Sequence, residues 1–160
     1  SGKLPYTYPK YDGVIEFYDH PRSVDRSGKS WGFDAFDPEW EFGFGLSYTD
    51  FEYSNLTIDK TSLSNTESIT ISIDVKNIGE RSGMEVVQLY INDKVAAYVP
   101  AGKRLRGFQK IHLDRGEKKK ISFTISADDL KFADRDGDWI LEPGVFELTI
   151  DKQKTTFELK

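Results

Sequence analysis

Hydrophobic and polar residues alternate along most of the chain after position 48. The clearest example runs from Ile69 to Val75, where isoleucine and valine are separated by Thr70, Ser72 and Asp74. Because successive side chains of a strand point to opposite faces, this pattern buries one face and leaves the other in water. Similar alternation recurs near residues 51–58, 87–91, 105–113, 121–125, 146–150 and 157–159. The pattern therefore predicts about seven short strands.

Turn-forming residues separate these strands at Asn77-Ile78-Gly79, Pro100-Ala101-Gly102, Arg115-Gly116, Asp136-Gly137 and Pro143-Gly144. Short strands joined in this way are typical of an antiparallel, immunoglobulin-like β-sandwich. We expect one helical turn, at residues 127–130, with Ser126 or Asp128 as its cap. Residues 79–83 are expected to form a turn between two strands, where Asn77 and the glycines tolerate positive φ. Gly107 is expected to mark a bulge or a close backbone approach.

The first 47 residues form an aromatic-rich extension that does not show this alternation. It contains half of the chain's aromatic residues, interrupted by glycine and proline, with one possible strand at 14–18 and a polar loop at 23–30. So many rings are expected to cover a surface rather than stay in water. The extension either packs on the sandwich or belongs against a domain outside this chain. The predicted division is an irregular extension over 1–47 and a sandwich over 48–160.

Composition narrows the range of partners. With 38% hydrophobic and 31% charged residues, the chain has the composition of a globular protein rather than a disordered one. Its net charge of -5 argues against nucleic acid or an anionic membrane as the main partner. No apolar stretch is long enough to span a bilayer. The absence of cysteine excludes a disulfide, a thiol nucleophile or a thiolate metal site within this sequence.

Acidic residues cluster in the extension, at Asp34, Asp37, Glu39 and Glu41. Glycoside hydrolysis uses two carboxyl groups on either side of the scissile bond. Closeness in sequence does not establish that arrangement, so no catalytic role is assigned to these residues.

The segment Asp134–Asp138 resembles a calcium loop in composition only, because Trp139 stands at the sixth position, where an EF-hand loop needs glycine, and Val145 at the twelfth, where it needs glutamate. A tight turn through Asp136-Gly137 is the favoured interpretation, with a loop-type calcium site as the alternative. His20 and His112 have no suitably spaced companion, so neither a zinc site nor a catalytic triad is expected. We therefore expect no cofactor and no metal.

The three tryptophans, Trp31, Trp40 and Trp139, could stack on sugar rings, whose faces are apolar. The alternative is that each packs in a core or an interface. Both interpretations stay open at this point.

Several motifs in order along the chain resemble the C-terminal region of family 3 glycoside hydrolases. They are SGKLPYTYP at 1–9, YDHP at 18–21, PEWEFGFGLSYT at 38–49, VKNIGERSGMEVVQLYI at 75–91, RLRGFQKIHLDRGEKKKISFTI at 104–125, DLKFAD at 129–134 and WILEPGVFELTI at 139–150. The resemblance implies the end of an α/β domain followed by a fibronectin type III-like sandwich. It also implies that both catalytic acids lie on preceding domains, so no catalytic residue is transferred to this chain.

The resemblance further implies a parent enzyme that hydrolyses β-glucosides or β-xylosides, in the periplasm or secreted. Its remaining domains, and a β-linked oligosaccharide, are the implied partners. A carbohydrate-binding or protein-interaction module is the alternative function. The residues expected to contact either a sugar or a neighbouring domain are Trp31, Phe36, Trp40, Phe42, Phe44 and Trp139.

Overall fold

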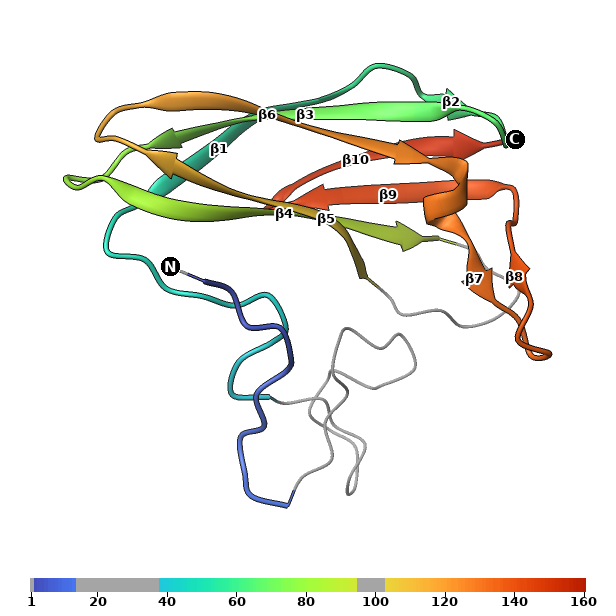
Figure 1. The fold of residues 1–160 in the computed structure, drawn as a ribbon, viewed down its shortest axis with the longest axis horizontal. Helices are drawn as coiled ribbons and strands as arrows, with labels where there is room; N and C mark the ends of the chain where they lie inside the picture. The colour runs from blue at the N-terminus through green and yellow to red at the C-terminus, as the bar shows by residue number, and fades with distance from the viewer. Residues whose placement is uncertain (1, 14–37, 95–102) are drawn as a thin grey trace.

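A computed structural model describes residues 2–13, 38–94 and 103–160 of the chain. Two β-sheets stack face to face, which confirms the predicted all-β sandwich (Figure 1). The long strands of the described residues are β1 (Phe51–Ile58), β3 (Ser68–Asn77), β4 (Gly83–Asp93), β5 (Arg104–Leu113), β6 (Lys118–Ser126), β9 (Gly144–Ile150) and β10 (Gln153–Leu159). Three two-residue strands accompany them: β2 (Ser62–Leu63), β7 (Phe132–Ala133) and β8 (Trp139–Ile140).

The smaller sheet has the strand order β1-β3-β6, and the larger one has the order β2-β10-β9-β4-β5. Strands β7 and β8 form a separate hairpin at one end. The pairings are antiparallel, as predicted, except between β2 and β10, which run parallel. A parallel pair needs a long connection rather than a tight turn. Here the connection from β2 to β10 contains most of the other strands of the sandwich. Local sequence patterns do not reveal a pairing between strands so far apart in the chain.

The residues that alternate in the sequence form one core between the sheets. The isoleucines of β3 and β6 share one core with apolar side chains of β4, β9 and β10, and Phe146 stacks on Phe157 with ring centroids 5.5 Å apart. Burying each such side chain stabilises the fold by about 1.5–3 kcal/mol relative to exposure. Fully or almost fully buried residues of the predicted strands include Ile69, Ile71, Ile73, Val75, Val87, Leu89, Ile91, Ile121, Phe123, Ile125, Phe146, Leu148, Ile150, Phe157 and Leu159.

Two glutamine side chains bridge between strands of opposite sheets. Gln153 on β10 donates a 2.6 Å hydrogen bond to the carbonyl of Tyr53 and accepts one of 3.1 Å from the Leu56 amide. These backbone groups lie next to a bulge in β1. On the other side, Gln109 of β5 donates a 2.7 Å bond to the carbonyl of Ser122 on β6. Side chains thus satisfy backbone groups that no neighbouring strand reaches.

The predicted turn lies between β3 and β4, but it does not use positive φ. Asn77, Gly79 and Gly83 do not have positive φ. The glycines are needed instead because residues 49 and 50 cross this turn closely. A Cβ on Gly79 would overlap the Thr49 hydroxyl and lie 2.7 Å from the amide nitrogen of Asp50. A Cβ on Gly83 would lie 2.6 Å from Thr49 Cγ2.

The prediction for Gly107 is confirmed in both of its forms. The register between β4 and β5 shifts, so that Leu89 pairs with Gly107 while Tyr90 pairs with Leu105. Arg106 is the extra residue of this bulge. A Cβ on Gly107 would lie 2.9 Å from the ring of Phe123, so the backbone also approaches the core closely.

The predicted helical turn is the 3₁₀ helix η1 (Ala127–Leu130). Ser126 occupies the N-cap position, and its amide and hydroxyl both donate to the carboxylate of Asp129. Asp128, the other predicted cap, instead forms a 2.7 Å ion pair with Lys131.

The N-terminal part of the described chain, residues 2–13 and 38–47, forms a strap that projects from the sandwich on the side of β4 and β5 (Figure 1). The strand expected at 14–18 and the loop expected at 23–30 lie outside the described residues. The predicted boundary between residues 47 and 48 stays a prediction. Within the described ranges, no helix is both long and apolar enough to cross a membrane.

Candidate functional site

The strap consists of two short segments held together by backbone hydrogen bonds. Leu4 donates to the carbonyl of Phe44 and accepts from the amide of Gly43, each over 2.8 Å. Farther along, Tyr8 donates to the carbonyl of Trp40 over 2.8 Å. Gly43 has a φ of 83°, and a side chain there would overlap the hydroxyl of Tyr90. The strap therefore has a defined shape and contacts β4 closely.

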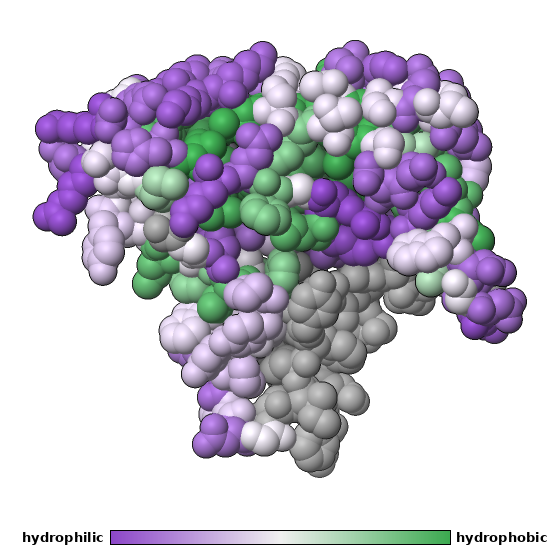
Figure 2. Space-filling view, viewed as in Figure 1, coloured by the Kyte–Doolittle hydropathy of each residue, from purple (hydrophilic) through white to green (hydrophobic). Residues whose placement is uncertain are grey.

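Aromatic rings form a continuous row along the strap. Tyr6 contacts Tyr8 at 6.3 Å, Tyr8 contacts Trp40 at 5.2 Å, and Trp40 stacks on Phe44 at 6.1 Å between ring centroids. Trp40 thus has ring neighbours on two sides, whereas Phe44 ends the row. Trp40 remains 41% exposed and Phe44 40% exposed. Figure 2 shows apolar residues gathered where the strap meets the sandwich on this face.

A groove of about 470 Å³ lies between the strap and the sandwich. Residues of the strap form one wall, and residues of β4 form the floor. The residues that line it are Lys3, Pro38, Glu39, Trp40, Glu41, Phe42, Gly43, Phe44, Tyr53, Glu85, Val86, Gln88, Tyr90, Lys103 and Asp151.

A polar contact between three segments anchors the strap at this groove. The buried carboxylate of Glu85 on β4 accepts a 2.9 Å hydrogen bond from the hydroxyl of Tyr53 on β1 and forms a 3.1 Å ion pair with Lys3. Burial, followed by the charge of Glu85, raises the pKa of Tyr53 well above its usual range, so the phenol stays protonated and donates. Glu85 is therefore already paired within the fold.

Tyr90 joins the strap to the sheet. The ring of Phe42 meets it edge-on at 6.4 Å, and the ammonium of Lys103 lies 4.2 Å from its centroid, within cation–π range. Its hydroxyl donates a 3.3 Å hydrogen bond to Gln88. Burial, and then the charge of Glu41, raises the pKa of Tyr90 to about 12. No local sequence pattern indicates a role for Tyr53, Glu85, Tyr90 or Lys103, because their contacts join segments far apart in the chain.

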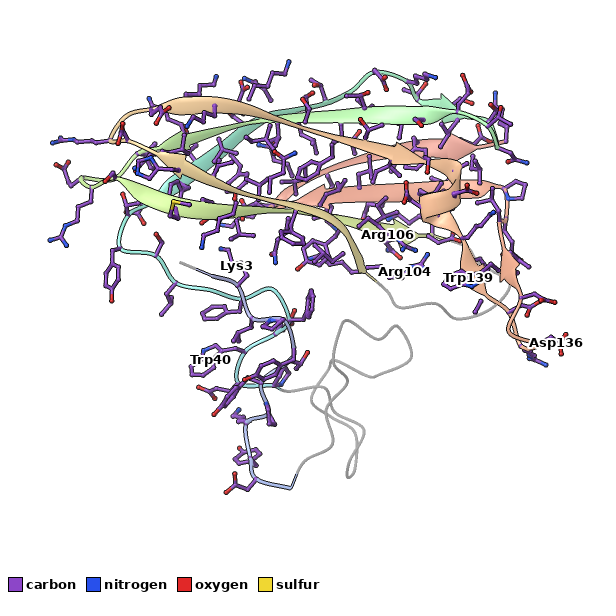
Figure 3. The ribbon with its side chains drawn as sticks, in the orientation of Figure 1. Lys3, Trp40, Arg104, Arg106, Asp136 and Trp139 are labelled. Atoms are coloured by element: carbon purple, nitrogen blue, oxygen red, sulfur yellow. The ribbon has the colours of Figure 1, made fainter. Side chains whose placement is uncertain are left out.

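Three of the six residues predicted to contact a sugar or a neighbouring domain line the groove. Trp40, Phe42 and Phe44 all line it. Trp139 lies at the opposite end of the molecule, on β8, where it is 70% exposed (Figure 3). Trp31 and Phe36 lie outside the described residues. Whether any of these side chains contacts a sugar or a neighbouring domain stays a prediction.

The acidic cluster of the extension is only partly described. Glu39 and Glu41 line the groove, whereas Asp34 and Asp37 lie outside the described residues. The groove is open to solvent along the strap and its most buried carboxylate, Glu85, is paired with Lys3. The described geometry therefore gives no support for a catalytic acid pair within the described part of this groove.

The segment Asp134–Asp138 forms the predicted tight turn. Its flanks pair as the hairpin of β7 and β8, and Gly137 has a φ of 90°. One oxygen of Asp134 accepts from the amides of both Asp136 and Asp138, each over 2.9 Å. The carboxylate of Asp134, a calcium ligand in the alternative interpretation, therefore holds the turn in shape.

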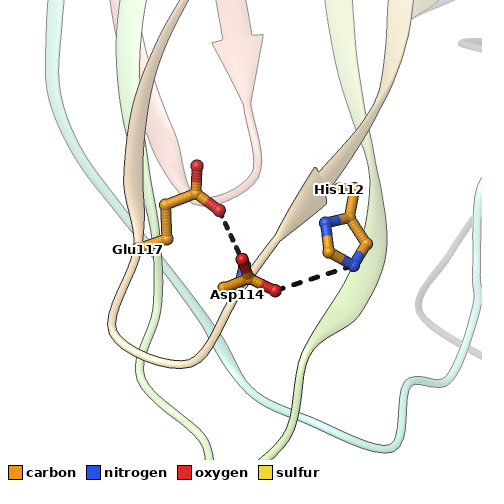
Figure 4. A group of neighbouring side chains, drawn as sticks. All are labelled: His112, Asp114 and Glu117. Atoms are coloured by element: carbon orange, nitrogen blue, oxygen red, sulfur yellow. Dashed lines mark hydrogen bonds and ion pairs between the residues drawn. The ribbon is translucent and has the colours of Figure 1, made fainter.

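The expectation that His112 has no companion was wrong. The β5–β6 hairpin brings ligand atoms of His112, Asp114 and Glu117 within 4.8 Å of one another (Figure 4). However, Glu117 accepts a 2.7 Å bond from the Asp114 amide and pairs with Lys119 at 3.1 Å. These contacts lower the pKa of Glu117 and fix the turn. The nearby ammonium of Lys119 also opposes a bound cation. His20 lies outside the described residues.

Two arginines converge on the end of η1 (Figure 3). Arg104 donates to the carbonyls of Leu130 and Lys131, and Arg106 donates to that of Lys131, each over 3.3 Å. Burial lowers the pKa of Arg106. These guanidinium groups satisfy carbonyls at a helix end, a structural role.

Comparison with known proteins identifies the sandwich. A family model described as a fibronectin type III-like domain matches residues 85–154. A putative β-xylosidase of Formosa agariphila is 37% identical over the whole chain, which covers 22% of that protein. A periplasmic β-glucosidase of Salmonella typhimurium is 35% identical over 94% of the chain, covering 21% of that protein. The chain thus spans about a fifth of the length of these curated relatives.

Solved structures agree. A β-glucosidase involved in saponin metabolism from intestinal bacteria superposes with a TM-score of 0.89 at 35% identity, over all of this chain and 22% of that one. A β-glucosidase from Listeria innocua, in complex with glucose, gives a TM-score of 0.85 at 27% identity, over 99% of this chain and 24% of that one.

Proposed function

We propose that this chain, which corresponds to the C-terminal, fibronectin type III-like region of family 3 glycoside hydrolases, is a non-catalytic portion that stabilises the catalytic domains of such an enzyme. The parent would hydrolyse β-glycosidic bonds, as the names of the β-glucosidase and β-xylosidase relatives suggest. Residues 1–47 would end the preceding domain and residues 48–160 would form the sandwich.

One observation carries the proposal: the sandwich buries its own core, yet the strap and its junction with β1 leave large apolar side chains in water. Tyr48 is 96% exposed, and Leu46 and Tyr11 are also exposed. Large apolar side chains left this exposed are typical of a contact with another protein surface. The strap and its junction with β1 would therefore supply the contact with the preceding domains, through Tyr11, Leu46 and Tyr48.

The alternative function is a carbohydrate-binding or protein-interaction module. The exposed Trp139 favours it, since an unpartnered ring could stack on a sugar. No nucleic acid or membrane is proposed as a partner. Because one relative is named as periplasmic, we propose a periplasmic or secreted location.

The test is to produce the preceding domains of the same polypeptide separately and mix them with this chain. A stable one-to-one complex in which the catalytic part melts at a higher temperature would support the proposal. Tyr48→Ala and Tyr11→Ala should weaken the complex, whereas Thr124→Ala, an exposed change on the far face of the smaller sheet, should not. Failure to associate, or hydrolysis of an aryl β-glucoside by this chain alone, would contradict it.

A further inference from the structure

The groove between the strap and β4 is pre-formed in this chain. Two backbone hydrogen bonds between Leu4 and residues 43–44 fix its outer wall, and the Lys3–Glu85 ion pair ties that wall to the sheet. Its volume of about 470 Å³ lies in the range of small-molecule sites. A ligand the size of one or two sugar rings would fit without rearrangement of the strap.

Phe44 supplies an apolar surface in this groove. Its ring stacks on that of Trp40, and 40% of the residue is exposed, so part of its surface is available to a ligand. The carbon-bound hydrogens of a pyranose make one of its faces apolar, which suits contact with an aromatic ring. Gln88, on the floor, brings an amide that can both donate to and accept from hydroxyl groups.

The charges of the groove restrict the ligand further. Four carboxylates and two lysines line the groove, and one of these lysines, Lys3, is paired with Glu85. The lining residues therefore carry more negative than positive charge. Carboxylates accept strong hydrogen bonds from hydroxyl groups, whereas they repel a uronate or a sulfate ester.

We propose that this groove binds a neutral pyranoside of one or two rings, with Phe44 against the ring face and Gln88 and Asp151 bonding to hydroxyl groups. This site goes beyond the proposed stabilising function and does not depend on it, because it is built from residues of this chain alone. It would hold a sugar on the accessory region itself.

The experiment is an NMR titration of the ¹⁵N-labelled 160-residue chain with methyl β-glucopyranoside, cellobiose and xylobiose, and in parallel with glucuronate. Saturable shifts at the amides of Phe44 and Gln88 with a neutral sugar, and none with glucuronate, are expected. Phe44→Ala should weaken binding about tenfold, the worth of one aromatic contact. Gln88→Ala should also weaken sugar binding, while the rest of its NMR spectrum stays unchanged. This second variant keeps the test valid if Phe44→Ala disturbs the strap.

Matched controls are Phe108→Ala and Trp139→Ala, which remove exposed rings outside the groove. Both should leave the affinity unchanged. The absence of saturable shifts with all three neutral sugars would overturn the proposal. So would equal binding of glucuronate, or a loss of binding confined to Trp139→Ala. None of these results depends on whether the chain associates with the preceding domains.

Discussion

Thr49 donates a 2.8 Å hydrogen bond from its hydroxyl to the side-chain oxygen of Asn77, at the point where the strap enters the sandwich. The same oxygen accepts from the amide of Gly79, and the side-chain nitrogen of Asn77 donates to the carbonyls of Arg81 and Leu113. Asn77 has 0% exposure, so every polar group of its side chain is satisfied inside the protein. This one residue connects the strap, the β3–β4 turn and the end of β5.

Replacing Asn77 by aspartate should destabilise the sandwich strongly. Asn77→Asp loses both donated bonds and places a buried charge against two carbonyls, a cost of about 3 kcal/mol or more. Urea unfolding of the purified chain measures it. Thr49→Val, which removes one bond and leaves the amide of Gly79 as a partner, should cost about 1 kcal/mol. Equal effects of the two changes would contradict the central role of Asn77.

The close approach of Thr49 to Gly83 should appear as energetic coupling. Gly83→Ala should destabilise the fold by about 1–3 kcal/mol through overpacking against Thr49 Cγ2. Thr49→Ser removes that methyl group and keeps the hydroxyl, so it should relieve much of the cost in the double variant. A double-mutant cycle by chemical denaturation gives the coupling. Gly2→Ala, which meets no atom within 4 Å, is the control. Additive effects would show that the contact is unimportant.

Gln153 should contribute more to the free energy of unfolding than Gln109 does. Gln153→Ala leaves a backbone carbonyl and a backbone amide of β1 without partners, whereas Gln109→Ala frees one carbonyl that lies near water. We expect losses of about 2 and 1 kcal/mol respectively in the free energy of unfolding. Hydrogen exchange at Leu56 should accelerate in Gln153→Ala. An unchanged exchange rate there would argue against the bridge.

Glu147 should stabilise the fold in a pH-dependent way. It pairs with Lys94 at 2.7 Å and with Lys154 at 3.0 Å, and hydrogen bonds from these lysines lower its pKa. A carboxyl group whose pKa is lower in the folded state stabilises at pH values above its unfolded pKa of about 4.3, and this contribution is lost as the pH falls through the folded value. Glu147→Gln should therefore cost up to about 1 kcal/mol at pH 7, because both lysines are partly exposed.

At pH values below the lowered pKa, wild type and Glu147→Gln should have nearly the same stability. Denaturant unfolding at neutral and acidic pH measures both. Thr124→Ala, an exposed change that removes no ionisable group, is the control. A deficit of equal size at both pH values would mean that packing rather than charge is responsible.

The strand pattern was predictable because a strand carries its own burial signal in every second residue. Ile69 to Val75 needed no knowledge of partners to reveal which face is buried, and Gly107 indicated a bulge by its missing side chain. His112 and Asn77 show where this reasoning ends. The companions of His112 come together only when a hairpin closes, and the role of Asn77 depends on carbonyls contributed by other segments.

The sequence by itself determined the all-β class, the faces of the strands, the turn at Asp136-Gly137 and the resemblance to the C-terminal region of family 3 glycoside hydrolases. Only the tertiary structure decided that the strap folds against β4, that Lys3 and Tyr53 both contact Glu85, and that Trp40 and Phe44 border a groove while Trp139 does not. The physical reason is the separation along the chain over which each effect acts. Alternation and turn chemistry act between near neighbours in the chain, whereas a groove is formed by segments whose closeness depends on the packing of the whole sandwich.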